Sequence, residues 1–436
     1  MNRRTNWRVL GAVVAGSATL MPIAHAQEED RATLELEVGA ERSDNVARVP
    51  VDEQSETNGT ARLGVALERV RSRYEAKLSG DVQYRRYSED TFGSDVVGGL
   101  AGRLDWLILP EHLVWVFEDN YGQVTSDPLQ ADTPDNREQT NYFSTGPDIT
   151  VPLGARTVLL ASGRYSDNYY EESEQGSRSV DGSVGIGRRL TEQTTLSLNG
   201  SISDIEYDQS AVNPDYTITS AFLRLESTGT RTTFEADAGY TEAERDGQTS
   251  DGPLFRASIA YQITGRSIVS FDAGYVFTDS GAALRVDQSA LGAGSEVNDT
   301  LAAGDVFRDT YAYLTFTTER DRSALSASIF GRKERHEDII ILDRDIVGAD
   351  LSVSRNLTQR IELTVEGGYR DEDFVVGDVA FQEWFAGVGL GWRLTPSVSL
   401  RTSIFHYVGS GDGASRDYEE NRAYIGIRYT TSRGAP

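Results

Sequence analysis

The chain contains no cysteine among its 436 residues. This absence excludes disulfides, thiolate nucleophiles and zinc–thiolate sites. Histidine is almost as scarce, and His112, His336 and His406 have no companion at a metal-ligand or catalytic spacing. A Ser–His pair near an outer rim, with His336 as its base, is the one enzymatic alternative. We expect no catalytic residue, no cofactor and no metal, and therefore no enzyme.

The chain also lacks an excess of positive charge. It has 42 Lys and Arg against 68 Asp and Glu, a formal net charge of −26. Because binding to phosphates requires a basic surface, we expect no nucleic-acid partner.

Long apolar runs are missing too, since no segment after the N-terminus approaches the roughly 18 residues of a membrane helix. The N-terminus itself has three arginines, then an apolar run over 9–20, then a small-x-small site, Ala24-His25-Ala26. This is the order of a secretory signal peptide. We predict a signal peptide over residues 1–26 and a mature chain over 27–436.

Alternation with a period of two is what the mature chain has instead. In 381–394, FQEWFAGVGLGWRL, large apolar residues on one face oppose glycine and charged residues on the other. The same pattern predicts strands in 32–41, 232–240, 359–370 and 423–429. Aromatic residues near the ends of the apolar faces are typical of membrane girdles. The girdle candidates are Trp384, Trp392, Tyr240, Tyr369 and Tyr429.

Short and long connections alternate along the chain. Nine short turns, such as Thr395-Pro396, separate ten longer polar segments, such as 43–56, 126–138 and 244–251. Together these connections join about 20 strands, within a range of 16 to 20. Outer-membrane barrels have this arrangement, with short periplasmic turns and long extracellular loops. The fold class we predict is all-β, a single transmembrane antiparallel up-and-down β-barrel. A soluble sandwich or solenoid also alternates, but it leaves the aromatic ends unexplained.

Two segments stand out within this pattern. Pro147 cannot donate to a strand ladder, so we expect a bulge, a gap in the ladder or an early strand end there. Residues 280–305 form the longest loop, and a loop of this length is usually functional or disordered. We expect it to form a constriction in the pore or a lid, with a surface loop as the alternative.

The faces that oppose the apolar ones would line a water-filled lumen. A mixed wall with an acidic excess favours cations or neutral solutes over anions. Inward tyrosines could stack on sugar rings or simply fill space; they include Tyr311, Tyr313, Tyr418 and Tyr424. The pore-lining candidates are Glu35, Glu37, Asp81, Arg85, Glu118, Glu235, Asp237, Asp272, Glu362, Glu366, Arg370, Arg393, Arg422 and Arg428.

Four segments carry a resemblance: ERSDNV (41–46), DNYGQVTSDP (119–128), TPDNREQTNYFSTGP (133–147) and GRYSDNYYEES (163–173). They resemble the outer-membrane β-barrel family associated with PEP-CTERM and exopolysaccharide systems, which is related to the barrel porins of polysaccharide loci. The resemblance implies a pore associated with exopolysaccharide secretion across the outer membrane of a Gram-negative bacterium. It implies outer-membrane lipid and lipopolysaccharide, secreted polysaccharide and periplasmic export components as partners. It supplies no catalytic residue.

Two other functions remain open from the sequence. A general diffusion porin for small hydrophilic solutes would have the same wall. A structural or adhesive surface barrel would act through its outer loops.

Overall fold

The computed structural model describes residues 30–173, 175–209, 213–279, 298–301, 305–377, 379–411 and 417–434. The predicted signal peptide lies outside these residues and stays a prediction. The described residues form one sheet of 21 strands. The first eleven are β1 (Asp30–Ser43), β2 (Glu56–Arg71), β3 (Tyr74–Tyr87), β4 (Asp95–Leu109), β5 (Leu113–Thr125), β6 (Arg137–Pro152), β7 (Thr157–Tyr170), β8 (Ser177–Arg189), β9 (Thr194–Tyr207), β10 (Tyr216–Thr228) and β11 (Thr232–Arg245). The others are β12 (Gln248–Thr264), β13 (Ser267–Asp279), β14 (Asn298–Leu301), β15 (Val306–Arg320), β16 (Ser323–His336), β17 (Arg344–Asn356), β18 (Ile361–Phe374), β19 (Val379–Arg393), β20 (Val398–Gly411) and β21 (Tyr418–Gly434).

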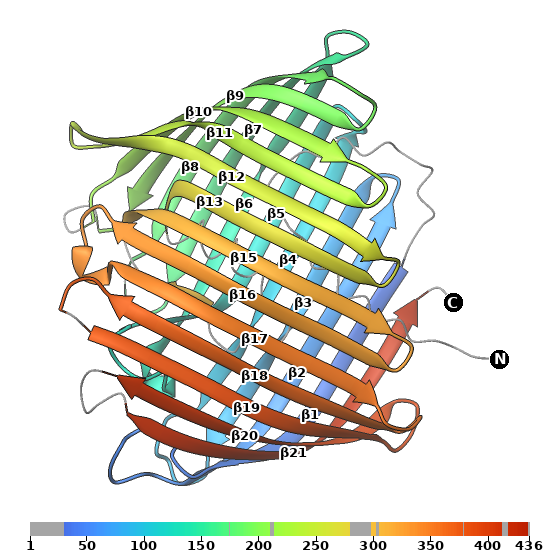
Figure 1. The fold of residues 1–436 in the computed structure, drawn as a ribbon, viewed down its shortest axis with the longest axis vertical. Helices are drawn as coiled ribbons and strands as arrows, with labels where there is room; N and C mark the ends of the chain where they lie inside the picture. The colour runs from blue at the N-terminus through green and yellow to red at the C-terminus, as the bar shows by residue number, and fades with distance from the viewer. Residues whose placement is uncertain are drawn as a thin grey trace.

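The sheet closes on itself into a barrel (Figure 1). Each long strand pairs antiparallel with the next in the chain, β13 pairs with β15, and β1 pairs with β21 in register from Arg31 to Ser43. Leaving out the four-residue β14, 20 strands form the wall. The all-β, up-and-down barrel of about 20 strands is confirmed. Closure matters because it leaves no strand edge with unpaired backbone groups.

The two faces of the wall differ as the alternation predicts. Along β19, Trp384 and Trp392 are 42% and 52% exposed on the outside, and the glycines between them face inward. Leucine, valine and isoleucine fill the outer face on other strands, for example Leu36 and Val38 on β1. A continuous apolar outer face of this kind fits hydrocarbon surroundings and not water.

The two ends of the barrel also differ. Short turns join the strands at one end, which we call the turn end, and both chain termini emerge there (Figure 1). Longer connections lie at the opposite end, the loop end, with two exceptions: the two-residue turn between β11 and β12 and the four-residue connection between β18 and β19. The predicted long loop 244–251 is wrong, because β11 and β12 form a hairpin around Asp246 and Gly247, whose φ angles are 47° and 77°. Asp-Gly favours such tight turns, since both positions need a positive φ.

Pro147 lies inside β6, so an early strand end is wrong. The ladder between β6 and β7 is interrupted at Gly146 and Pro147, and it resumes in the same register at Asp148. The carbonyl of Pro147 still accepts a hydrogen bond from Arg164 at 3.1 Å. The interruption is therefore a gap without a bulge.

Candidate functional site

The inner wall carries the charged residues, most of them in cross-strand pairs. Residues directly opposite in an antiparallel ladder share a face, and the registers place all fourteen pore-lining candidates on the face away from the apolar belt. The five girdle candidates lie on the outer face. Ion pairs join Arg428 to Glu35 and Glu37, Arg62 to Asp81, Arg103 to Glu118, and Arg224 to Glu235 and Asp237. Glu362 and Arg393 lie exposed near the turn end.

The loop end of the lumen is where the site forms, and the first loop builds one side of it. Ser43 Oγ donates to Glu420 at 2.7 Å, and the Asn45 side chain donates to the carbonyl of Glu419 at 3.0 Å. Asp44 accepts the backbone N–H of Asn421 at 2.7 Å. The Ser-Asp-Asn motif within ERSDNV thus ties the first loop to the last strand, directly beside the closure of the barrel.

Arg48 follows this motif and points into the lumen. Its φ is 49°, and only 4% of the residue is exposed. Its Nε donates to Glu420 at 3.0 Å and its Nη1 to Glu383 at 3.3 Å. Burial would lower the pKa of Arg48, but Tyr418, Glu383 and Glu420 more than offset it, so the pKa is raised and the guanidinium stays charged. No periodic pattern predicts this residue, because it lies in a loop.

A second loop, between β5 and β6, reaches Arg48 from the other side. Asn136 shapes it: its Oδ1 accepts the N–H of Asp127 at 2.8 Å, and its Nδ2 donates to the carbonyl of Ala131 at 3.1 Å. Asp132 accepts two bonds from Arg137, at 2.6 and 2.8 Å, and lies 3.7 Å from Arg48. We call the contacts of Arg48 with Glu420, Glu383 and Asp132 the Arg48 lock.

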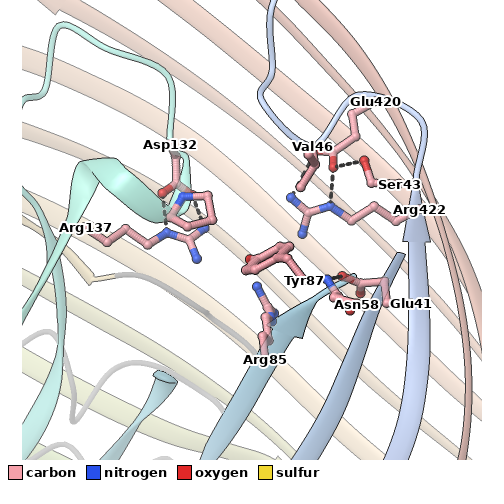
Figure 2. A pocket seen from close by; sticks show the side chains of 11 residues that line it. Glu41, Ser43, Val46, Asn58, Arg85, Tyr87, Asp132, Arg137, Glu420 and Arg422 are labelled. Atoms are coloured by element: carbon pink, nitrogen blue, oxygen red, sulfur yellow. Dashed lines mark hydrogen bonds and ion pairs between the residues drawn. The ribbon is translucent and has the colours of Figure 1, made fainter. Parts of the chain in front are cut away.

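Figure 2 shows the space between these two loops. Asp132 and Arg137 lie on one side, Glu420 and Arg422 on the other, and Arg85 and Tyr87 of β3 lie between them. The remaining cavity is about 10 Å³, which is no larger than one water needs. The loops and side chains therefore fill this part of the mouth.

Buried carboxylates anchor the other outer loops. The carboxylate of Glu56 accepts hydrogen bonds from the backbone N–H groups of Ser88 and Glu89, in the loop after β3. The carboxylate of Glu138 accepts hydrogen bonds from the backbone N–H groups of Glu172 and Ser173, in the loop after β7. The carboxylate of Asp305 accepts hydrogen bonds from the backbone N–H groups of Asp338 and Ile339, at 2.9 Å each. Each carboxylate satisfies loop amides that would otherwise be buried without a partner. Some of the excess acidic residues therefore hold the outer loops in place inside the mouth.

A four-residue piece of the longest loop, β14, pairs with a distant strand of the wall. Most of 280–305 lies outside the described residues, but β14 pairs in parallel with Val124 and Thr125 at the loop end of β5. The loop starts at β13 and ends at β15, eight or more strands away from β5 around the wall. The described part of this loop, 298–301, thus lies against β5; the predicted constriction or lid otherwise falls on residues outside the described ones.

A second buried charge cluster lies on β15 to β18. Arg344 contacts Glu334 at 2.5 Å and also Glu372, and Arg332 contacts Asp309 and Glu334 at 3.0 and 3.1 Å. These side chains are almost fully buried. Alternating charges of this kind stabilise a fixed geometry, because a lone buried charge is very costly.

The histidines are far apart. His112 lies in a turn, His406 contacts Trp384 with ring centroids 5.3 Å apart, and His336 lies against Phe307, with Nδ1 3.6 Å from Asp305. His336 is the last residue of β16, at the loop end, and is buried. Across the described part of the chain, no three His, Asp or Glu residues are grouped to hold a metal ion.

No protein-family model matches the chain, and no curated protein matches it. Among solved structures, a mutant of the ferric enterobactin receptor PfeA of Pseudomonas aeruginosa is similar at 10% identity and a TM-score of 0.45, over 93% of this chain and 81% of that one. The FrpB iron transporter of Neisseria meningitidis is similar at 10% identity and a TM-score of 0.45, over 93% of this chain and 83% of that one. The likeness concerns the fold alone. Within the described residues, no helix is long and apolar enough to cross a membrane.

Proposed function

We propose that the chain is a gated pore of the Gram-negative outer membrane that passes secreted exopolysaccharide. The turn end then faces the periplasm and the loop end faces outward. The proposal depends on one observation, the Arg48 lock. Arg48 of the first loop is held by ion pairs and hydrogen bonds to β19 and β21, and one ion pair with Asp132 joins it to the second loop. These contacts can be exchanged for contacts with a passing polymer or with water.

The nature of these contacts favours a gate over a permanent plug. Breaking apolar packing would expose apolar surface to water at the full hydrophobic cost, whereas polar groups can change partners when the loop moves. A general diffusion porin needs an open mouth at rest, and here the lock occupies part of it. The resemblance of the loop motifs to the exopolysaccharide-associated family supports the choice of cargo.

The test measures secreted and periplasmic polysaccharide in a strain that lacks the chain, with plasmid rescue. We expect secretion to fall, polymer to accumulate in the periplasm, and rescue to restore both. Unchanged secretion would reject the export role. A second arm measures the conductance of the purified barrel in planar bilayers, where a gated pore is mostly silent and a diffusion porin conducts steadily.

A further inference from the structure

Aromatic rings gather on one part of the inner wall. On β15 and β16, the ring of Tyr313 lies 5.8 Å from Tyr311 and 5.6 Å from Phe330. On β19 and β20, Tyr407 lies 5.6 Å from Phe385 and 6.0 Å from Phe405. All of these side chains are partly exposed on the lumen face. We call them the aromatic track, which consists of Tyr311, Tyr313, Phe330, Phe385, Phe405 and Tyr407.

Glycines determine how four of these rings lie, and one of them is Tyr311, which a Cβ atom at Gly274 would overlap. A Cβ atom at Gly348 would overlap the ring of Phe330, one at Gly368 would overlap Phe385, and one at Gly387 would overlap Phe405. Each ring therefore leans over the neighbouring strand, and it stays partly exposed on the lumen face. Gly348 and Gly368 lie on adjacent strands, β17 and β18, so the two halves of the track approach each other there.

The outer end of the track is covered by the Arg48 lock. The guanidinium of Arg48 lies 5.2 Å from the ring centre of Tyr407 and 4.9 Å from that of Tyr418. Arg422 also lies 4.9 Å from the ring centre of Tyr407. A planar cation on an aromatic face occupies the place that a flat ligand would take. Release of Arg48 would uncover this end of the track.

The charge beside the track differs between its ends, with cations at its outer end and carboxylates toward the turn end. Glu366 and Glu362 lie on the same inner face toward the turn end, and the residues directly opposite them are Ser352, Gly387, Asn356 and Gly391, all uncharged. The chain as a whole has a formal charge of −26. A polymer that enters from the turn end meets these carboxylates before it reaches Arg48 and Arg422 at the outer end, so an acidic polymer would be repelled there and a neutral one would not.

We propose that the aromatic track binds a neutral glycan chain through stacking of sugar rings on the aromatic faces. The C–H face of a pyranose is apolar and flat, and its hydroxyl groups can bond to the charged side chains beside the rings. This inference rests on the proposed export function and narrows its cargo to uncharged polysaccharide.

The test uses the full-length barrel in detergent micelles and the fluorescence anisotropy of labelled maltohexaose, a neutral probe. Phe385→Leu combined with Tyr407→Leu should weaken binding at least tenfold. Phe222→Leu is the matched control, because that inward ring also lies over a glycine, Gly239, on nearly the opposite wall. It should change binding less than twofold. Labelled hexagalacturonate, an acidic probe of equal length, should bind at least tenfold more weakly than maltohexaose.

The outcomes separate this inference from the export function. Equal binding by the wild type and the double variant, or no binding by either, overturns the track. Tighter binding of hexagalacturonate overturns the choice of neutral cargo. Each variant must first migrate as a folded, heat-modifiable band, and Phe385→Leu alone replaces the double variant if that fails. If the track binds maltohexaose but deletion of the chain leaves secretion unchanged, the track stands and the export function falls. If deletion blocks secretion but the double variant secretes and binds normally, the export function stands and the track falls.

Discussion

Arg48 and Glu420 are 372 positions apart in the chain, and Nε of the arginine donates to Oε2 of the glutamate at 3.0 Å. The contact joins the first outer loop to the last strand across the seam where the barrel closes. Both side chains are buried, with 4% and 0% exposed. This ion pair holds the first loop in the mouth of the barrel. Its removal should therefore open the mouth and leave the strands of the wall intact.

Arg48→Ala should therefore raise the mean current through the barrel. Hydrogen bonds to charged groups contribute about 1.5–3 kcal/mol each, so the loss of even one of them should shift the gate at least about tenfold toward the open state. Planar-bilayer recordings measure this shift. Arg178→Ala is the control, since Arg178 pairs with Asp167 at 3.3 Å on the exposed rim and is 59% exposed. A wild-type barrel that already conducts at the level of Arg48→Ala would contradict the gate.

Arg344→Met should destabilise the folded barrel. The change leaves Glu334 and Glu372 buried without their shared cation, and breaking a buried pair costs about 3–5 kcal/mol. Urea unfolding followed by tryptophan fluorescence measures the free energy of unfolding. Arg335→Met is the neighbouring control, because Arg335 pairs with Asp345 and is 36% exposed; we expect a change of about 1 kcal/mol or less. Equal effects for the two variants would show that the cluster contributes no more than a surface pair.

Processing of the N-terminus gives an independent prediction. The small-x-small site at Ala24-His25-Ala26 should be cut before Gln27 during export. The intact mass of the protein purified from outer-membrane fractions should then correspond to residues 27–436. A mass that includes residues 1–26 would reject the signal peptide.

The wall was predictable from the sequence, and the mouth was not. Alternation reports which face of a strand meets lipid, so residues such as Glu37, Asp237 and Trp384 could be assigned to a face without a structure. A loop has no period, so nothing in the pattern distinguishes a loop that folds inward from one that extends into water. Arg48 and Asp132 were missed for this reason. The one usable signal was asparagine beside acidic residues, because Asn45 and Asn136 both shape loops through several hydrogen bonds.

The track depends on glycine at defined positions, and Gly387 tests this. A Cβ at Gly387 would overlap the ring of Phe405, whereas one at Gly389 would make only ordinary contacts, the nearest at 3.7 Å. Gly387→Ala should displace the ring, at a cost of about 1–3 kcal/mol in the free energy of unfolding, and should weaken maltohexaose binding. Gly389→Ala should leave both unchanged. The same urea titration and anisotropy measurements compare the variants, and equal behaviour would show that ring placement does not depend on Gly387.

Asn136 shapes the second loop, so its removal should loosen the loop without touching the lock directly. Asn136→Ala deletes the side-chain bonds to Asp127 and Ala131, and the loop amides should then exchange hydrogen about tenfold faster, since each net hydrogen bond contributes about 1 kcal/mol. Hydrogen-exchange mass spectrometry of the peptide over 126–136 measures the rate. Asn141→Ala is the control, because Asn141 makes one exposed bond to Asp119 at 3.0 Å. If Asn136→Ala also raises the bilayer current, the position of Asp132 contributes to the closed state. Faster exchange with unchanged current would assign the closed state to the contacts of Arg48 with Glu420 and Glu383 alone.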